Sequence, residues 1–220
     1  MGGAKVSDKL PIIRNLLSLA DNIIITGGMA FTFLNHLHNM KIGSSLFESN
    51  NEKYIQEVIQ EAQLKGVKLH FPTDFTISQF SNFSDYLKGG DLLSSVAPIH
   101  VTAKEGIPDG YLGLDIGPNS IQRFNEIISN SKCVALNGPS GLMEHPLYQD
   151  GTVKIMENIS RMTHNDNEFI SVIGGGDSVN SIRFCKEDVQ FSHVSTGGGA
   201  SLEMLEGKVL PGISALSDLE

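Results

Sequence analysis

Segments with the period of an amphipathic helix recur along the chain. In residues 51–65, apolar side chains are spaced three and four positions apart, so they fall on one face of a helix. Residues 119–130 and 153–162 repeat this spacing. The pattern predicts three helices, each with one buried face. The faces consist of Ile55, Val58, Ile59 and Ala62; Ile121, Phe124, Ile127 and Ile128; and Val153, Met156, Ile159 and Met162.

Short apolar or β-branched runs separate the helical segments. Residues 23–26, 169–173 and 192–196 each end directly in glycines, which is typical of buried strands followed by turns. Residues 68–71 and 132–136 are further strand candidates. Because strands and helices alternate, we expect a layered α/β fold with a mostly parallel sheet.

One long segment, residues 73–108, does not follow this alternation. It is rich in Ser, Gly and Pro and shows no sustained period, so it is either a surface excursion or a β-hairpin. No internal repeat and no linker rich in Pro or Ser divides the chain. We therefore expect one domain over residues 1–220.

Composition narrows the class of protein. With 40% apolar residues and 19% charged residues, the chain resembles ordinary globular proteins and not disordered ones. No run approaches the roughly 18 consecutive apolar residues of a membrane span. A net charge of −9 disfavours non-specific attraction to nucleic acid or anionic lipid. Two cysteines and no basic-then-apolar start lead us to expect a cytoplasmic protein.

Clustered glycines are the most informative feature of the composition. The chain has 23 glycines, and several clusters directly follow strand candidates. Turns of this kind let backbone N–H groups approach phosphate closely, although glycine can also simply end a strand. Neither G-x-x-x-x-G-K-[ST] nor G-x-G-x-x-G occurs in the sequence, which argues against a Walker-type NTPase and against a standard dinucleotide-binding fold.

Two charged features accompany the glycines. Lys5 and Lys9 are four residues apart, which on a helix would place both ammonium groups on one face, either around an anion or simply in solvent. Asp177 follows Gly174, Gly175 and Gly176 at an expected helix start, where it could cap the helix or hold Mg²⁺ against nucleotide phosphates.

Other reactive residue types give weaker signals. Ser192 and His193 share a strand candidate with no acid nearby in the sequence, which disfavours a nucleophilic pair. His36 and His38 are two apart on an expected helix and face different directions, which is poor metal geometry. We expect Cys133 to be a small buried hydrophobic residue.

Six ordered motifs follow one another along the chain: residues 2–9 (GGAKVSDK), 27–33 (GGMAFTF), 113–118 (GLDIGP), 137–141 (NGPSG), 174–178 (GGGDS) and 195–201 (STGGGAS). In this order they resemble phosphoglycerate kinases, and the likeness runs from Gly2 to the region of Pro211. It covers nearly the whole chain but only the C-terminal half of that two-domain family. It implies a Rossmann-like three-layer domain.

The resemblance also implies roles for individual residues. The phosphate-contacting lysines would be Lys5 and Lys9, with Lys9 nearest the transferred group. Residues expected near the nucleotide are Gly3, Ala4, Gly27, Gly28, Gly113, Leu114, Asn137 and Pro139, with Glu144 at the ribose. Phosphate would be held by Gly175, Gly176 and Ser178, magnesium by Asp177, and the moving phosphoryl group by Gly197, Gly198 and Gly199.

The activity implied is phosphoryl transfer between 1,3-bisphosphoglycerate and ADP, giving 3-phosphoglycerate and ATP in glycolysis. Such transfer needs positioning and charge stabilisation by Lys, Mg²⁺ and backbone N–H groups, and no covalent enzyme intermediate. The family is usually monomeric. Its substrate-binding N-terminal domain, with a catalytic arginine, has no counterpart here, so the chain alone is expected to be inactive.

Two further departures from the family matter. The family places a strand directly before the Gly-Gly-Ala-Lys turn, whereas only Met1 precedes Gly2, so one sheet strand is expected to be missing. The aromatic contact to adenine is unassigned between Phe80 and Phe83. Alternative hypotheses are a non-catalytic nucleotide-binding module, and a nicotinamide-dependent oxidoreductase that lacks its fingerprint.

Overall fold

Parallel strands fall in two separate groups. The computed structural model describes residues 1–79, 97–186 and 188–217. Within these ranges β1 (Asn22–Ile24) pairs in parallel with β2 (Lys68–His70). The second group has the order β6-β7-β8, all parallel, and comprises β6 (Cys133–Asn137), β7 (Ile170–Gly174) and β8 (His193–Ser195). The five parallel strands predicted from the sequence are therefore confirmed.

An antiparallel sheet occupies part of the segment that showed no period. It has the order β4-β3-β5, with β3 (Asp74–Gln79), β4 (Ile99–Thr102) and β5 (Tyr111–Ile116). β3 and β4 pair from Asp74 with Thr102 to Ile77 with Ile99, as the arms of a hairpin do. The hairpin alternative is therefore the correct one for these strands. The candidate adenine contacts Phe80 and Phe83 lie outside the described residues.

The three predicted helices are confirmed as α3 (Glu52–Lys65), α5 (Pro118–Ser129) and α6 (Asp150–Asn165). α3 ends at Gly66, whose left-handed φ of 73° suits glycine. The other helices are α1 (Leu10–Leu16), α2 (Gly28–His38), α7 (Gly176–Ser181), α8 (Gly199–Leu205) and α9 (Pro211–Ser214), with 3₁₀ turns at Ser49–Asn51, Pro146–Tyr148 and Ile182–Phe184.

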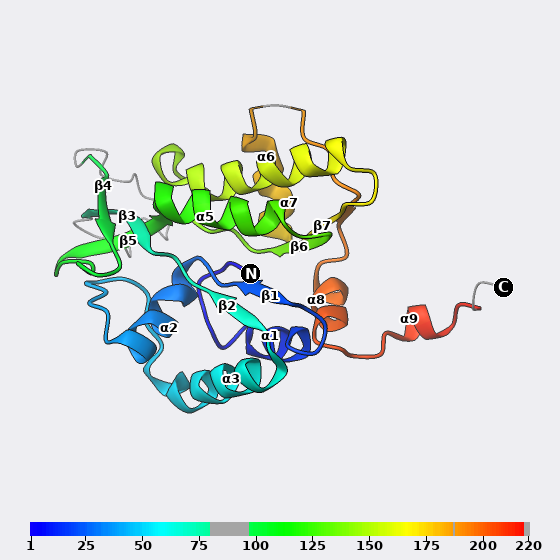
Figure 1. Cartoon of the computed structure of the whole chain (residues 1–220), viewed down its shortest axis with the longest axis horizontal. Coiled ribbons are helices and arrows are strands. Elements are labelled where there is room, and N and C mark those ends of the chain that lie inside the picture. Colours follow the sequence, from blue (N-terminus) through cyan, green and yellow to red (C-terminus); the bar gives the residue numbers. More distant parts are fainter. Residues whose placement is uncertain (80–96, 187, 218–220) are drawn as a thin grey trace.

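The helices form outer layers around the parallel strands (Figure 1). α5 and α6 lie on one side of β6 and β7, and α1 and α3 lie beside β1 and β2. Ile23 belongs to the apolar cluster shared with α1, α2 and α3, whereas its neighbour Ile24 contacts the cluster of α5 and α6. Successive side chains of β1 thus reach opposite layers, as the pleat of a strand requires. This is the expected Rossmann-like three-layer arrangement.

The N-terminus lies between the two groups of parallel strands (Figure 1). The Met1 amine donates to the carbonyl of Ile24 at 2.8 Å, and the Met1 carbonyl accepts from Thr26 N at 2.9 Å. On the other side, Gly2 N donates to the carbonyl of Asn137 at 2.8 Å. In the described residues β1 and β6 do not pair with each other. Met1 and Gly2 thus connect the two groups of parallel strands by single hydrogen bonds to each.

Cys133 differs from its prediction, because it is exposed and not buried. It begins β6, which among the described strands pairs only with β7 and so forms the edge of its sheet. In the ranges that the structure describes, no helix combines the length and the apolarity needed to cross a membrane.

Candidate functional site

The ends of the parallel strands meet at one edge. Asn137, the last residue of β6, is level with Gly174 of β7, and Gly174 is level with Ser195 of β8. The three following turns carry residues 138–141, 175–178 and 196–199. Because ligands of open parallel sheets bind beyond the carboxyl ends of the strands, this edge is where a site is expected.

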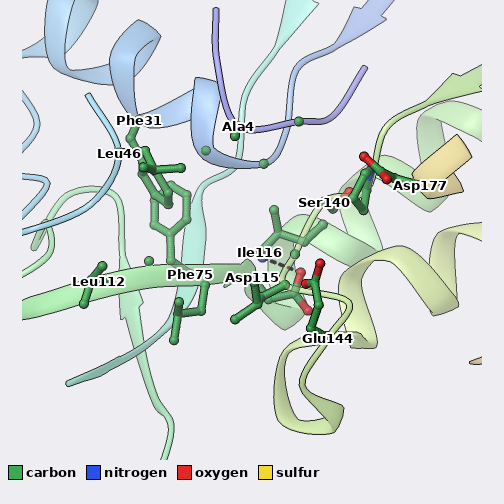
Figure 2. Close-up of a pocket in the computed structure, with 18 residues that line it drawn as sticks. Ala4, Phe31, Leu46, Phe75, Leu112, Asp115, Ile116, Ser140, Glu144 and Asp177 are labelled. Atoms are coloured by element: carbon green, nitrogen blue, oxygen red, sulfur yellow. Dashed lines mark hydrogen bonds between the residues drawn. The ribbon is translucent and has the colours of Figure 1, made fainter. Parts of the chain in front are cut away.

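A cavity of about 210 Å³ opens beside this edge (Figure 2). It extends from the turn after β6 to β5 and to the start of α2. Both the N-terminal turn and the antiparallel sheet therefore contribute to its walls. The residues singled out from the sequence that line it are Gly3, Ala4, Gly27, Gly28, Gly113, Leu114, Pro139, Glu144 and Asp177.

One end of the cavity is apolar and depends on close backbone approach. Phe31 and Phe75 contact each other there, with ring centroids 5.1 Å apart, and Leu46 and Leu112 complete the wall. A Cβ on Gly113 would lie 2.2 Å from the Phe31 ring, so any larger residue would require that ring to shift. This end offers an apolar, partly aromatic surface of the kind that packs against a planar ring.

Gly27 has a second steric requirement. Its φ is 70°, and a Cβ there would lie 2.6 Å from the carbonyl oxygen of Gly3. α2 begins at the next residue, and Met29 N donates to that same Gly3 carbonyl at 3.1 Å. The glycine thus lets the start of α2 and the N-terminal turn meet at the cavity wall.

Two carboxyl groups, Asp115 and Glu144, line the middle of the cavity (Figure 2). Asp115 is buried and accepts from Ile116 N at 2.8 Å and from Gly151 N at 2.7 Å, which holds the first turn of α6. Burial raises the pKa of Asp115 to about 8, against the opposing effect of these two hydrogen bonds. Glu144 is the more exposed of the two and is free to meet a ligand hydroxyl.

A polar cluster, formed by Lys9, Asn137 and Asp177, lies at the end of β6. The Lys9 ammonium donates to the side-chain oxygen of Asn137 at 2.5 Å. Desolvation lowers the pKa of Lys9, and the negative charge of Asp177 partly offsets that lowering. The amide nitrogen of Asn137 is buried without a hydrogen-bond partner among the described residues. A buried donor without a partner beside an ammonium group is suited to an anionic ligand.

The predicted helix carrying Lys5 and Lys9 is wrong. α1 begins only at Leu10, and both lysines belong to the turn before it. The Glu48 carboxylate fixes this turn by accepting from Val6 N at 2.6 Å and from Ser7 N at 3.0 Å. Lys5 is exposed, whereas Lys9 is half-buried, so the structure distinguishes two residues that the spacing treated alike.

The turn after β7 also differs in detail. Asp177 does not cap α7, because Gly175 occupies the capping position and Asp177 is the second helical residue. Its side chain instead lies at the edge of the cavity (Figure 2). Ser178 is fully buried, and its hydroxyl oxygen accepts from Gly138 N at 2.7 Å. Ser178 therefore ties the turns after β6 and β7 together.

The remaining glycines follow β7 and β8. A Cβ on Gly175 would meet the Asn137 side chain at 3.1 Å, so this turn adjoins the polar cluster. Gly176, Gly198 and Gly199 have no atom within 4 Å of an added Cβ, and Gly197 to Gly199 are exposed. Their backbone is accessible at the edge where the strands end.

Several lining residues were not singled out from the sequence. Phe75 lies in the segment without a period. Phe31, Asp115, Ser140 and Gly141 are within the quoted motifs, so the motifs pointed to this cavity without assigning a role to these four residues.

Comparison with known proteins agrees with this geometry. The family model described as phosphoglycerate kinase matches residues 1–208. The phosphoglycerate kinase of Drosophila melanogaster is 43% identical over 217 residues, which cover 99% of this chain and 49% of the relative. That of Dictyostelium discoideum is 44% identical over 220 residues, covering 100% of this chain and 49% of the relative.

Solved structures give the same result. The phosphoglycerate kinase of Coxiella burnetii has a TM-score of 0.83 at 30% identity, covering 97% of this chain and 50% of that one. The chain spans about half the length of the relatives it matches. By motif order, by sequence and by fold, the chain belongs to the phosphoglycerate kinase family.

Proposed function

We propose that the chain is the nucleotide-binding half of a phosphoglycerate kinase, in which it binds Mg²⁺ with ADP or ATP. The observation that carries the proposal is one cavity with an aromatic wall at one end and Asp177 at the other, where Asp177 adjoins the hydrogen-bonded pair of Lys9 and Asn137. A nucleotide has the matching order of groups, from a planar base through a ribose to phosphates. The names of the relatives favour this over a non-catalytic module.

The base is proposed to lie between the wall of Gly27 and Gly28 and that of Gly113 and Leu114. Phe31 and Phe75 provide the aromatic surface there. Glu144 then meets the ribose hydroxyls from the middle of the cavity. Gly3, Ala4 and Pro139 line the path towards the polar cluster.

The phosphates are proposed to reach Lys9, Asn137 and the backbone of Gly175 and Gly176. The unpaired Asn137 amide would donate to a phosphate oxygen and thereby gain the partner it lacks. Lys5 adds charge from the exposed side of the same turn. Ser178, whose hydroxyl accepts from Gly138 N, acts by fixing the turn that holds the phosphates.

The residues present fit a magnesium ion. Mg²⁺ is bound by one or two carboxylates together with substrate phosphates and waters. Asp177 provides such a carboxylate at the cavity edge, close enough to Lys9 for its charge to offset part of the lowering of the Lys9 pKa by desolvation. When bound, the ion would neutralise charge on the phosphates.

Phosphoryl transfer between 1,3-bisphosphoglycerate and ADP needs an in-line arrangement and stabilised equatorial oxygens. Lys9 supplies a positive charge on a half-buried stem, and desolvation strengthens its interaction with phosphate. The exposed backbone N–H groups of Gly197, Gly198 and Gly199 are proposed to donate to the moving group. The sugar-acid substrate would be held by the other half of the enzyme, so the chain alone turns over negligibly.

We further propose one domain over residues 1–220 and a monomeric, cytoplasmic protein that acts in glycolysis. These expectations follow the family and not any contact in the structure.

Binding of Mg·ADP, measured by titration calorimetry, tests the proposal. Lys9→Ala and Asp177→Ala are expected to weaken binding by at least about tenfold, because each removes a charge interaction with the phosphates or the ion. Lys65→Ala and Asp150→Ala are matched controls, since both residues are in exposed surface ion pairs. NADH serves as a ligand that should not bind.

Undiminished binding by both site variants would place the nucleotide elsewhere. Stronger binding of NADH than of Mg·ADP would favour an oxidoreductase, and the kinase proposal would then be wrong.

A further inference from the structure

One short segment, residues 45–48, contacts both the wall of the cavity and the turn before α1. Ser45 is buried, and its hydroxyl oxygen accepts from Gly113 N at 2.9 Å. Leu46 lines the apolar end of the cavity (Figure 2). Glu48 instead binds residues of the turn before α1, and it is not among the residues that line the cavity.

Glu48 meets three donors of the turn that carries Lys9. Its carboxylate accepts from Val6 N at 2.6 Å, from Ser7 N at 3.0 Å and from the Ser7 hydroxyl at 2.8 Å. Desolvation acts to raise the pKa of Glu48, but these hydrogen bonds and the charge of Lys5 together lower it. The side chain is therefore a carboxylate near neutral pH.

The two backbone donors belong to the start of a helical turn. Lys9 N and Leu10 N both donate to the Val6 carbonyl, at 2.9 and 3.0 Å, and α1 continues from there. The first N–H groups of a helix have no partner within it, and a capping side chain ordinarily provides one. The capping residue of α1, Lys9, makes no such side-chain bond. Glu48 provides the acceptor from a segment 42 positions later than Val6.

The position of the Lys9 side chain depends on this turn. Val6 is fully buried in the cluster shared by α1, α2 and α3, so its side chain and the Glu48 carboxylate both anchor the turn. In this position Lys9 is half-buried, and its ammonium donates to Asn137. Without Glu48, Val6 N and Ser7 N would need water as a partner, and the turn would be free to move into solvent.

We propose that Glu48 is a positioning residue for phosphate binding, which caps the turn before α1 and thereby holds the Lys9 ammonium at the polar cluster. The inference rests on the proposed function, because it takes the ligand of that cluster to be the phosphates of ADP. Glu48 acts through the turn and contacts no part of the nucleotide.

This role predicts an effect opposite in sign to that of charge alone. A carboxylate near an anion site repels the anion, so removing its charge would by itself strengthen phosphate binding. If Glu48 positions Lys9, removing its charge weakens phosphate binding instead, because the ammonium loses its fixed place.

Binding of Mg·ADP and of adenosine to the whole chain, measured by NMR titration, tests the proposal. Glu48→Gln keeps the size of the side chain but turns an amide donor towards the backbone donors of the turn. We expect its affinity for Mg·ADP to fall by at least about tenfold and its affinity for adenosine to change by less than about twofold. Adenosine has no phosphate for Lys9 to meet, whereas general damage to the site would weaken both ligands.

Two matched variants separate the possible causes. Leu46→Ala alters the same segment at the apolar end of the cavity, and it should weaken Mg·ADP and adenosine to a similar degree. Asp8→Asn removes a negative charge from the same turn, where exposed Asp8 accepts only from the Ser7 hydroxyl among the described residues. Its affinity for Mg·ADP should equal or exceed that of the parent chain.

A double-mutant cycle tests whether Glu48 acts through Lys9. In the Lys9→Ala chain the turn has no ammonium to position, so adding Glu48→Gln should change Mg·ADP affinity by less than about twofold. A further tenfold loss in that chain would show that Glu48 acts by another route, and the proposal would then be wrong.

Unchanged or stronger Mg·ADP binding by Glu48→Gln would overturn the proposal, as would equal losses for Mg·ADP and adenosine. A loss in Asp8→Asn as large as that in Glu48→Gln would also overturn it, because charge and not capping would be the cause. Failure of the parent chain to bind Mg·ADP would refute the proposed function itself, and this inference with it. That result appears before any variant is made, so the two failures are distinguishable.

Discussion

The Lys9 ammonium donates to the Asn137 side-chain oxygen at 2.5 Å, which joins the turn before α1 to the end of β6. These residues are 128 positions apart in the sequence. The contact aims a half-buried positive charge at the edge where the turns after β6 and β7 meet. Asn137 is therefore expected both to position Lys9 and to donate to a ligand.

Asn137→Asp should weaken Mg·ADP binding by at least about tenfold, because a carboxylate there pairs with Lys9 and competes with phosphate. It also replaces the free amide donor with an acceptor. Calorimetry measures the loss, with Asn50→Asp, an exposed residue, as the matched control. Equal binding by Asn137→Asp and the parent chain would contradict the role of this pair.

Gly113→Ala should close the apolar end of the cavity. The added Cβ would lie 2.2 Å from the Phe31 ring, so the ring must move into the space proposed for the base. We expect nucleotide affinity to fall by about tenfold or more and stability to fall by about 1–3 kcal/mol. Gly212→Ala, where nothing lies within 4 Å, should change neither quantity. Calorimetry and urea unfolding provide the two readouts.

Asp74→Ala should destabilise the fold through α5. The buried Asp74 carboxylate accepts from Ser120 N at 2.7 Å, from Asn119 N at 3.0 Å and from the Ser120 hydroxyl. Loss of these bonds leaves buried donors unpaired at the helix start and should cost about 2–4 kcal/mol in urea unfolding. Asp150→Ala, which removes only an exposed pair, should cost under about 1 kcal/mol. A similar cost for the two variants would contradict this account.

The Met1 amine should make stability depend on pH. Its pKa is 8.0 in an exposed chain and about 5 when folded. Between these values the unfolded chain binds a proton that the folded chain does not. The free energy of unfolding should therefore fall as the pH drops from 8 to 5, by up to about 1.4 kcal/mol per pH unit.

Nα-acetylation removes the titration of the amine, so the difference in unfolding free energy between the free and the acetylated chain isolates its contribution. Asp115 has the opposite effect on stability between pH 8 and 5, because its raised pKa makes the folded chain bind a proton that the unfolded chain does not. The difference between the two unfolding profiles should be flat above pH 8. A flat difference down to pH 5 would show that the amine is not buried.

The spacing of apolar residues was sufficient to predict the helices that bury one face. Ile55, Val58 and Ala62 are all buried on α3 as predicted, because nothing in the tertiary structure competes with that face. The strands before glycines were located within one or two residues for the same reason. The hairpin of β3 and β4 had no such signal, since its arms pair with each other and with β5.

The site was only partly predictable because long-range contacts decide it. The helix expected at Lys5 and Lys9 fails because Glu48, from a distant loop, holds the backbone as a turn. Cys133 is exposed because its neighbour in the sheet is absent, which no local pattern reveals. Phe75 reaches the cavity through strand pairing that its own segment does not encode.

The buried N-terminus has a practical consequence for handling the protein. An affinity tag fused before Met1 would have to pass between β1 and β6, because the Met1 amine donates to Ile24 O of β1 and Gly2 N donates to Asn137 O of β6. A tag after the last residue avoids this conflict, because α9 lies apart from the body of the molecule in Figure 1 and its residues are exposed. Purification schemes for this chain should therefore place the tag at the C-terminal end and leave the Met1 amine free.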